Sequence, residues 1–342
     1  MKAILTLTAG PLGGMETFSS HLCETFPDLK IIDFSQASQS LLAKIPFPFA
    51  TMPHKGMVIC RHFMRMQKQL KADAVFTSGL YGWYLALRGI DIPIINTLHG
   101  VAKSFAMDSY KKTTFDYYRM KYIYSLAERI SAKRSVSVCN SNFTRELIKK
   151  HYNVESKVIF NAVDTRIFRP IPKPESREIL KLPDRTTGIF VGPPAYSKGF
   201  DIIQKLASIH RDIDFLCISP KNASSGQKNL KIISGVDHSQ LYKYYSAADF
   251  CIFPSRFEGF GYVPLEALAC NTPVIARKTG ILTEFSPPGS FLIDNSSVND
   301  YSKAIFEFVN NLKYPKTHVL IKENFSLERF SREYKNLVKN LW

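Results

Sequence analysis

The sequence has no Cys-x-x-Cys pair and no cysteine spaced with a histidine as in a structural metal site. Its six cysteines fall mostly in apolar runs, such as Phe250-Cys251-Ile252-Phe253. Isolated thiols in apolar runs are typical of buried cysteines in a reducing compartment. The full set is Cys23, Cys60, Cys139, Cys217, Cys251 and Cys270.

Long apolar runs, short internal repeats and low-complexity tracts are also missing. No run approaches the about 18 apolar residues of a membrane-spanning helix. The first seven residues are too short for a signal peptide and predict a strand. We therefore expect a cytoplasmic protein that meets a membrane, if at all, only as a peripheral protein on its inner face.

Acidic residues are scarce relative to basic ones. Against 45 Lys and Arg there are 29 Asp and Glu, which gives a formal net charge of +16. Such a surplus favours acidic partners: nucleic acid, anionic lipid or a phosphorylated substrate. With 342 residues, 45% hydrophobic and 22% charged, the chain has a globular composition and the length of about two domains.

Short apolar runs alternate with helical stretches along the whole chain, which predicts an α/β protein with parallel sheets. The predicted strands are residues 3–7, 30–34, 74–77, 93–97, 136–139, 157–160, 188–191, 214–218, 230–233, 250–253, 273–276 and 291–293. The predicted helices are residues 15–25, 57–70, 110–132, 143–151, 199–209, 239–247, 263–269, 298–311 and 327–341.

The pattern breaks at residues 168–175, where three prolines fall within five residues. Prolines at this density predict a stiff linker without regular structure, and we place the domain boundary there. The prediction is an N-terminal domain at 1–168, a C-terminal domain at 169–325, and a last helix at 326–342 that packs back on the first domain. Both domains would be Rossmann-like and doubly wound, and would face each other across a cleft. In such sheets, ligands bind at the carboxyl ends of the strands.

The strongest motif is residues 254–270, PSRFEGFGYVPLEALAC, which follow one predicted strand and open a helix. The glycines let the backbone pass close to a ligand, and free N–H groups at a helix start suit a diphosphate. Glu258 lies in the loop and Glu266 lies about two turns into the helix. The two carboxylates can therefore bind opposite ends of one ligand, a sugar and a ribose.

This motif resembles the E-x7-E signature of family 4 glycosyltransferases, retaining enzymes of GT-B fold, and the similarity continues through residues 271–276 and 279–284. The resemblance implies that Glu258 lies beside the donor sugar and that Glu266 binds the ribose. It also implies that backbone groups near Phe260, Gly261, Tyr262 and Val263 hold the phosphates or the sugar.

Two further motifs follow predicted strands of the first domain. Residues 10–16, GPLGGME, could be a plain turn, but they resemble the family's GGxE loop, which makes Gly13 and Gly14 donor-site candidates. Residues 96–100, NTLHG, place His99 at a strand end. A lone histidine is usually structural, yet the family has a similar histidine near the donor sugar. We predict that His99 hydrogen-bonds the sugar or stabilises positive charge at the anomeric carbon.

Residues 190–199, FVGPPAYSKG, resemble the family's Gly-Arg…Lys-Gly loop, whose cations grip the diphosphate. Gly192 and Lys198 match, but Pro193 stands where arginine is usual. Because the departing diphosphate carries charge that the protein must stabilise, the missing arginine has to be offset or activity falls. Arg256 and Lys278 are the candidate substitutes.

Three other sequence features are less specific. Ser219 ends the strand at 214–218, where such folds often hold the nucleotide base. Residues 140–144 and 161–164, with Ala162 in place of a common glycine, echo the family and are predicted to be structural. Asp212 and Asp214 have the spacing of a metal-binding DxD, but they precede their strand, so we predict no catalytic metal and no cofactor.

The charge surplus gathers in two stretches, residues 55–71, which have no acid, and residues 103–134, which are rich in tyrosine. Helical spacing would give each an apolar and a cationic face. An ordinary solvated face, contact with an anionic membrane and nucleic-acid binding all fit this composition. No recognisable nucleic-acid module accompanies the charge, so we expect no nucleic-acid partner.

Together these features predict a retaining, metal-independent, hexosyltransferase-type enzyme. It would move sugar from a nucleotide-diphosphate donor to a glycan or lipid-linked acceptor in cell-envelope or polysaccharide synthesis. A GT-B sugar-nucleotide epimerase and a catalytically degenerate nucleotide-sugar-binding protein are the alternatives, the latter because of Pro193.

Overall fold

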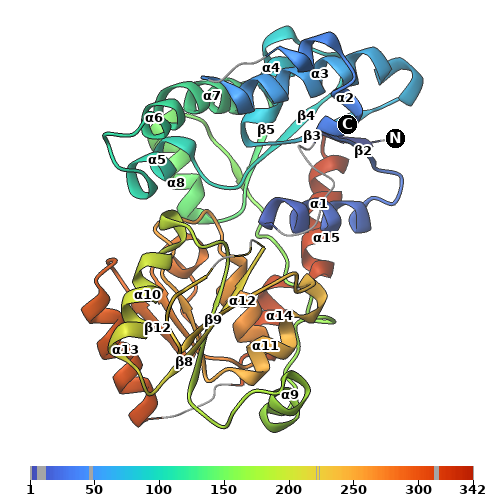
Figure 1. Ribbon diagram of the computed structural model, residues 1–342. Coiled ribbons are helices and arrows are strands. Elements are labelled where there is room, and N and C mark those ends of the chain that lie inside the picture. Colours follow the sequence, from blue (N-terminus) through green and yellow to red (C-terminus); the bar gives the residue numbers. More distant parts are fainter. Residues whose placement is uncertain are drawn as a thin grey trace. The chain divides into compact units, whose positions relative to one another are not determined.

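The computed structural model describes residues 2–5, 13–45, 49–220, 222, 224–311 and 316–341. The chain divides into two compact units (Figure 1). Unit 1 comprises residues 1–161 and 328–342, and unit 2 comprises residues 162–327. The division after Asn161 lies seven residues before the boundary predicted at 168, and the last helix belongs to unit 1.

Unit 1 is built on a six-stranded parallel sheet in the order β2-β1-β3-β4-β5-β6. The strands are β1 (Lys2–Leu5), β2 (Lys30–Ile32), β3 (Ala74–Ser78), β4 (Ile94–Leu98), β5 (Val136–Cys139) and β6 (Lys157–Val158). Its helices are α1 (Gly14–Thr25), α2 (Phe34–Ala37), α3 (Thr51–Leu70), α4 (Trp83–Arg88), α5 (Ala102–Ser109), α6 (Phe115–Tyr118), α7 (Ser125–Lys133), α8 (Asn142–Tyr152) and α15 (Leu327–Lys339).

Both faces of this sheet are covered, which explains why its strands lack polar alternation. Val75 of β3 packs in one cluster with Phe63 of α3 and Leu85 of α4. The next residue, Phe76, contacts Tyr334 of α15, with ring centroids 6.2 Å apart. Successive β3 side chains therefore enter cores on opposite faces of the sheet.

Unit 2 has a second six-stranded parallel sheet, in the order β12-β11-β10-β7-β8-β9. The strands are β7 (Thr187–Val191), β8 (Asp214–Ser219), β9 (Leu230–Ser234), β10 (Phe250–Phe253), β11 (Val274–Arg277) and β12 (Ser290–Ile293). Its helices are α9 (Lys173–Leu180), α10 (Phe200–Ile209), α11 (Leu241–Ala247), α12 (Tyr262–Ala269), α13 (Val298–Asn310) and α14 (His318–Phe325). Counted from β7, the strand order is that of the Rossmann fold.

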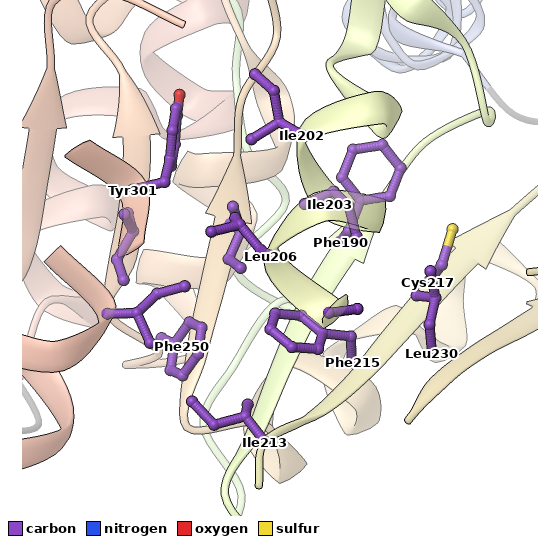
Figure 2. Packing of buried hydrophobic residues seen from close by; sticks show 14 of the residues in the cluster. Phe190, Ile202, Ile203, Leu206, Ile213, Phe215, Cys217, Leu230, Phe250 and Tyr301 are labelled. Carbon is purple, nitrogen blue, oxygen red and sulfur yellow. The ribbon is translucent and has the colours of Figure 1, made fainter. Parts of the chain in front are cut away.

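A hydrophobic core joins one face of this sheet to α10 and α13. Phe215 of β8 and Phe250 of β10 pack with Leu206 of α10 and Tyr301 of α13, all buried (Figure 2). The central strands of this sheet are thus buried as predicted, whereas most residues of the edge strands β9 and β12 are half-buried or exposed. Five of the six cysteines are buried as well, Cys23 is half-buried, and all six are free thiols.

Each of the twelve predicted strands is confirmed, with described ends within two residues of the prediction. The predicted linker is wrong in part, because its last proline lies inside a helix. Pro174 occupies the first turn of α9, where its missing N–H has no helical partner to lose. Three prolines therefore do not exclude regular structure when the last one begins a helix.

The single helix predicted over 110–132 is also wrong. The structure has α5, then a connecting segment, then a continuous helical segment from Phe115 to Lys133. Its middle, Arg119–Tyr124, is a π-helix. Apolar spacing alone could not reveal the connecting segment between α5 and α6, because the residues on both sides of it are amphipathic.

Candidate functional site

The sheet of unit 2 changes winding direction between β7 and β10, which are hydrogen-bonded neighbours. Ligands of doubly wound sheets bind outside the carboxyl ends of strands at such a point. The loops after these two strands meet there, since the Arg256 N–H donates to the Ser197 carbonyl over 2.9 Å. Gly199 has φ +74°, and a Cβ added there would come within 2.8 Å of the Pro254 side chain. The close approach of the two loops thus requires glycine.

Glu258 and Lys198, predicted from separate motifs, meet at this point. The Lys198 Nζ lies 2.6 Å from the Glu258 Oε1. The Ser255 hydroxyl donates to the same oxygen over 2.5 Å, and the Glu258 N–H donates to the Thr279 Oγ1 over 3.2 Å. The carboxylate is therefore held by two side chains, and its loop is fixed by a third. Neither Ser255 nor Thr279 was predicted, although both lie within or beside the quoted motifs.

The loop then opens α12 through a left-handed glycine, Gly261, with φ +95°. The segment that begins at Gly280 packs against this turn and fixes it, because the Ile281 N–H donates to the Phe260 carbonyl over 2.8 Å. The aromatic ring of Phe260 contacts that of Tyr262, with centroids 5.3 Å apart. Val263 follows in the first turn of α12. The first N–H groups of a helix have no helical acceptor, so this turn offers donors to an anionic ligand.

Glu266 is buried in the second turn of α12 and is held at both oxygens. The Tyr245 hydroxyl donates to Oε2 over 2.9 Å, and the His238 Nε2 lies 3.0 Å from Oε1. Although burial alone would lower the pKa of His238, the charge of Glu266 and their hydrogen bond raise it above its ordinary value. Burial and the charge of Glu266 also raise the pKa of Tyr245. Sequence reasoning missed both partners, which carry no motif.

The two substitutes proposed for the missing arginine differ in the structure. Arg256 is buried and forms a bidentate pair with Asp201, at 2.8 and 2.9 Å, and it also bonds the Tyr196 carbonyl. It is therefore committed to holding its loop. Lys278 follows β11 at the carboxyl edge of the sheet, is exposed, and forms no ion pair with any residue that the structure describes. Of the two, Lys278 is the one free to meet a ligand.

Gly192 and Ser219 lie at the same edge of the sheet. Gly192 follows β7 with φ +149°, and its N–H donates to the Ile218 carbonyl over 2.9 Å. Ser219 is the buried last residue of β8. Asp214 is at the opposite, amino end of β8 and pairs with Arg185 over 3.1 Å, and Asp212 precedes it in the turn. The described residues contain no group of three His, Cys, Asp or Glu side chains able to hold a metal ion.

The remaining predicted site residues belong to unit 1. Gly13 precedes α1 and Gly14 is its first residue, while residues 10–12 of the glycine motif lie outside the described residues. His99 follows β4, and its Nε2 lies 3.4 Å from the Ser78 Oγ. The ring of Phe18 from α1 contacts the His99 ring, with centroids 4.6 Å apart. Burial lowers the pKa of His99 to about 4, so its imidazole is neutral at pH 7.

Unit 1 also contains a buried carboxyl that sequence reasoning missed. Glu128 of α7 accepts at Oε2 from the Ala102 N–H, which begins α5, over 2.8 Å, and from the Tyr152 hydroxyl over 2.5 Å. Burial raises the pKa of Glu128 to about 7. Since α5 begins three residues after His99, Glu128 anchors the segment that carries this histidine. Helical periodicity places Glu128 on a helix but gives no sign of its burial.

Comparisons with known proteins agree with this geometry. The family model described as Glycosyltransferase Family 4 matches residues 12–167, and the one described as Glycosyl transferases group 1 matches residues 222–325. An uncharacterized glycosyltransferase of Methanocaldococcus jannaschii is 28% identical over 255 residues, which are 71% of this chain and 65% of the relative. D-inositol 3-phosphate glycosyltransferase of Streptosporangium roseum is 26% identical over 265 residues, 68% of this chain and 59% of the relative. The match thus spans about 60% of the length of these curated relatives.

Solved structures share the fold over almost the whole chain. Sucrose-phosphate synthase from Thermosynechococcus elongatus has a TM-score of 0.85 at 18% identity, covering 99% of this chain and 98% of that one. HepE of Anabaena, solved in complex with UDP-glucose, has a TM-score of 0.76 at 14% identity and covers 99% of both chains. WaaG, a glycosyltransferase involved in lipopolysaccharide biosynthesis, has a TM-score of 0.70 at 14% identity, covering 98% and 95%.

The chain is a glycosyltransferase of GT-B fold, as shown by its two α/β domains with parallel sheets, by these structural neighbours and by the two family models. The two models match separate parts of the sequence, and with the relatives they identify a family 4-like glycosyltransferase.

Proposed function

We propose that this glycosyltransferase moves a hexosyl group, with retention, from a nucleotide-diphosphate sugar to a glycan or lipid-linked acceptor of the cell envelope or of a polysaccharide. The observation that carries the proposal is the contact between Lys198 and Glu258 at the winding switch of unit 2. A cation and a carboxylate beside the start of a helix suit the two ends of a sugar diphosphate. HepE, with its bound UDP-glucose, supports a nucleotide-sugar donor.

In the proposed reaction, the bond between the anomeric carbon and the diphosphate oxygen breaks while the acceptor hydroxyl attacks from the same face. The acceptor's proton passes to the departing phosphate oxygen, so no protein base is needed. Lys198, Lys278 and the N–H groups of Tyr262 and Val263 stabilise the charge that develops on the diphosphate. Glu258 accepts hydrogen bonds from the sugar hydroxyls, and Glu266, fixed by His238 and Tyr245, binds the ribose.

The assignments in unit 1 complete the proposal. Gly13, Gly14 and His99 would act on the donor sugar and the acceptor. A neutral His99 can accept or donate a hydrogen bond without repelling positive charge at the anomeric carbon. The donor base would lie near Gly192 and Ser219. The proposed reaction needs no metal, because protein cations stabilise the charge of the departing diphosphate. We propose that it takes place in the cytoplasm.

One observation favours a second candidate, a degenerate nucleotide-sugar-binding protein. Pro193 replaces the usual arginine, Arg256 is engaged by Asp201, and Lys198 pairs with Glu258, so the diphosphate meets Lys278 and must compete with Glu258 for Lys198. A site with weaker charge stabilisation still binds the donor but releases the diphosphate slowly.

The test is release of nucleoside diphosphate from a panel of UDP-, GDP-, ADP- and dTDP-sugars, with and without membrane lipid extract. Transfer predicts release from one donor, stimulated by the lipid. Glu258→Ala should lower kcat about 100-fold or more with little change in melting temperature. Glu307→Ala, which removes an exposed carboxylate of α13, is the matched control.

Full activity of Glu258→Ala would contradict the assigned sugar site. Donor binding by thermal shift without release from any donor would identify the degenerate protein instead.

A further inference from the structure

The helical segment from Phe115 to Lys133 exposes one apolar face to solvent. Phe115, Tyr118, Tyr122 and Leu126 follow one another at three or four residues and are 52%, 52%, 57% and 58% exposed. We call these four side chains the aromatic stripe. The opposite face carries Tyr117, Tyr124 and Ala127, all buried.

Two rings of the stripe stack at the π-helical middle of the segment. The rings of Tyr118 and Tyr122 have centroids 6.3 Å apart and planes 12° apart. Phe49 extends the stripe at its start, since its ring lies 5.4 Å from that of Phe115.

This apolar exposure is concentrated. Of the fifteen exposed large hydrophobic side chains among the described residues, five lie between Phe115 and Leu126. Single exposed hydrophobic residues are normal, but a contiguous group marks a contact surface.

Cations border the stripe along its length. Arg119 lies 5.5 Å from the centre of the Phe115 ring, and Lys121 lies 5.2 Å from that of Tyr122. Arg129 and Lys133 are exposed at three and seven residues after Leu126, so they continue the same face. The acids of the segment offset only one of them: Asp116 pairs with Arg119, and Glu128 is buried. Lys121, Arg129 and Lys133 form no ion pair within the described part of the chain.

We propose that the aromatic stripe docks on the surface of an anionic lipid bilayer, with Phe115, Tyr118, Tyr122 and Leu126 at the level of the headgroups. An amphipathic helix of aromatic and aliphatic side chains edged by Lys and Arg lies in this way in a membrane interface. Tyrosine suits that depth because its ring is apolar and its hydroxyl remains hydrated. Each basic residue adds attraction to anionic lipid.

The same features disfavour other occupants. A second copy of the chain would bring the cations that border two stripes into one interface, where like charges repel. Single-stranded nucleic acid stacks on aromatic rings within a groove, but this stripe is the outer face of a helix and includes aliphatic Leu126.

The inference rests on the proposed function in one respect: docking would serve to bring unit 1 to a lipid-linked acceptor. Docking itself needs neither donor nor catalysis, so the two proposals can fail separately.

The test is flotation of the purified full chain with vesicles of phosphatidylcholine alone, or of phosphatidylcholine with about 30% phosphatidylglycerol. We expect co-flotation with the anionic vesicles only, and a several-fold loss in high salt. A variant carrying Tyr118→Ser, Tyr122→Ser and Leu126→Ser should bind anionic vesicles at least tenfold less.

The matched control carries Ile209→Ser, Phe306→Ser and Val319→Ser, three exposed hydrophobic side chains of unit 2. It should float as the unaltered chain does. Both variants should keep the melting temperature and the release of nucleoside diphosphate from soluble donor.

The proposal is overturned if the chain floats with neither vesicle, or if the stripe variant floats as well as the control. It is also overturned if the chain binds single-stranded RNA rather than vesicles, or is a dimer that only the stripe variant dissociates. If none of the three proteins releases nucleoside diphosphate from a donor, while the unaltered chain and the control still float with anionic vesicles, the result would instead count against the proposed function.

Discussion

Glu128 couples the stability of unit 1 to pH. The side chain is buried, bonds the start of α5 and Tyr152, and has its pKa raised to about 7 by burial. In an unfolded chain a glutamic acid has a pKa of about 4.3. Between these values the folded protein holds a proton that the unfolded chain has released, so folding becomes less favourable as the pH rises.

We predict that Glu128→Gln removes this pH dependence. At pH 3.5 the variant should match the unaltered chain, because Glu128 is then neutral in both the folded and the unfolded state and can accept from the Ala102 N–H. At pH 8 the unaltered chain must bury a charge, so the variant should be more stable by about 3–4 kcal/mol. Urea unfolding at the two pH values measures the difference. Parallel pH profiles would show that Glu128 is not protonated in the folded state.

At the residue scale, the sequence motifs predicted which side chains lie together at the site, but they did not predict the residues that surround and hold those side chains. Glu258 and Lys198 come from two motifs that both carry family resemblance, and the structure brings them into contact. His238 and Tyr245 could not be predicted, because their role depends on the fold placing them beside Glu266. The proposed roles of these residues, and of Glu258, Lys198, His99, Gly13 and Gly14, remain predictions.

At the element scale, the turn before α12 depends on Gly280. Its φ is +59°, and a Cβ added there would lie 2.5 Å from the Phe260 carbonyl oxygen and 3.2 Å from that of Glu258. Any side chain at this position must therefore displace the loop that carries Glu258.

We predict that Gly280→Ala lowers the free energy of unfolding by about 1–3 kcal/mol more than Gly235→Ala does. Gly235 has a similar positive φ of +75°, but an added Cβ would meet nothing within 4 Å, so it controls for backbone strain alone. Gly280→Ala should also raise the donor KM, which initial-rate kinetics would show. Equal destabilisation by both substitutions would mean that the loop adapts without cost.

Strands were easier to predict than helices for a physical reason. A parallel strand covered on both faces is a short, uniformly apolar run, as in Phe250–Phe253, and its ends are abrupt. Helix ends depend on capping and on local backbone geometry. Pro174 begins a helix where it was expected to prevent one, and the π-helical turn at Arg119–Tyr124 has no distinct sequence signature.

At the scale of the whole molecule, unit 1 is assembled from both ends of the chain. Tyr334 of α15 lies 3.0 Å from the Thr97 hydroxyl of β4, and Ser331 lies 2.8 Å from the Thr25 hydroxyl of α1. Phe330 contacts the ring of Phe18, with centroids 5.9 Å apart. The last helix therefore completes a core that the first 161 residues leave open.

We predict that a chain ending at residue 326 loses order in unit 1 only. Hydrogen exchange should accelerate in α1, β3 and β4, because they lose their α15 contacts, while β7 to β12 keep their protection. A chain ending at residue 339 is the control and should match the full protein. Equal loss of protection in both units would show that they do not fold as separate bodies.

This arrangement also orders events during synthesis. The ribosome makes the N-terminal part of unit 1 first, then all of unit 2, and only at the end the helix that closes unit 1. A nascent chain released after residue 327 holds a complete unit 2 and an unfinished unit 1 with its apolar face uncovered. The unit begun first is the last to be finished, so a prematurely terminated message yields no complete enzyme.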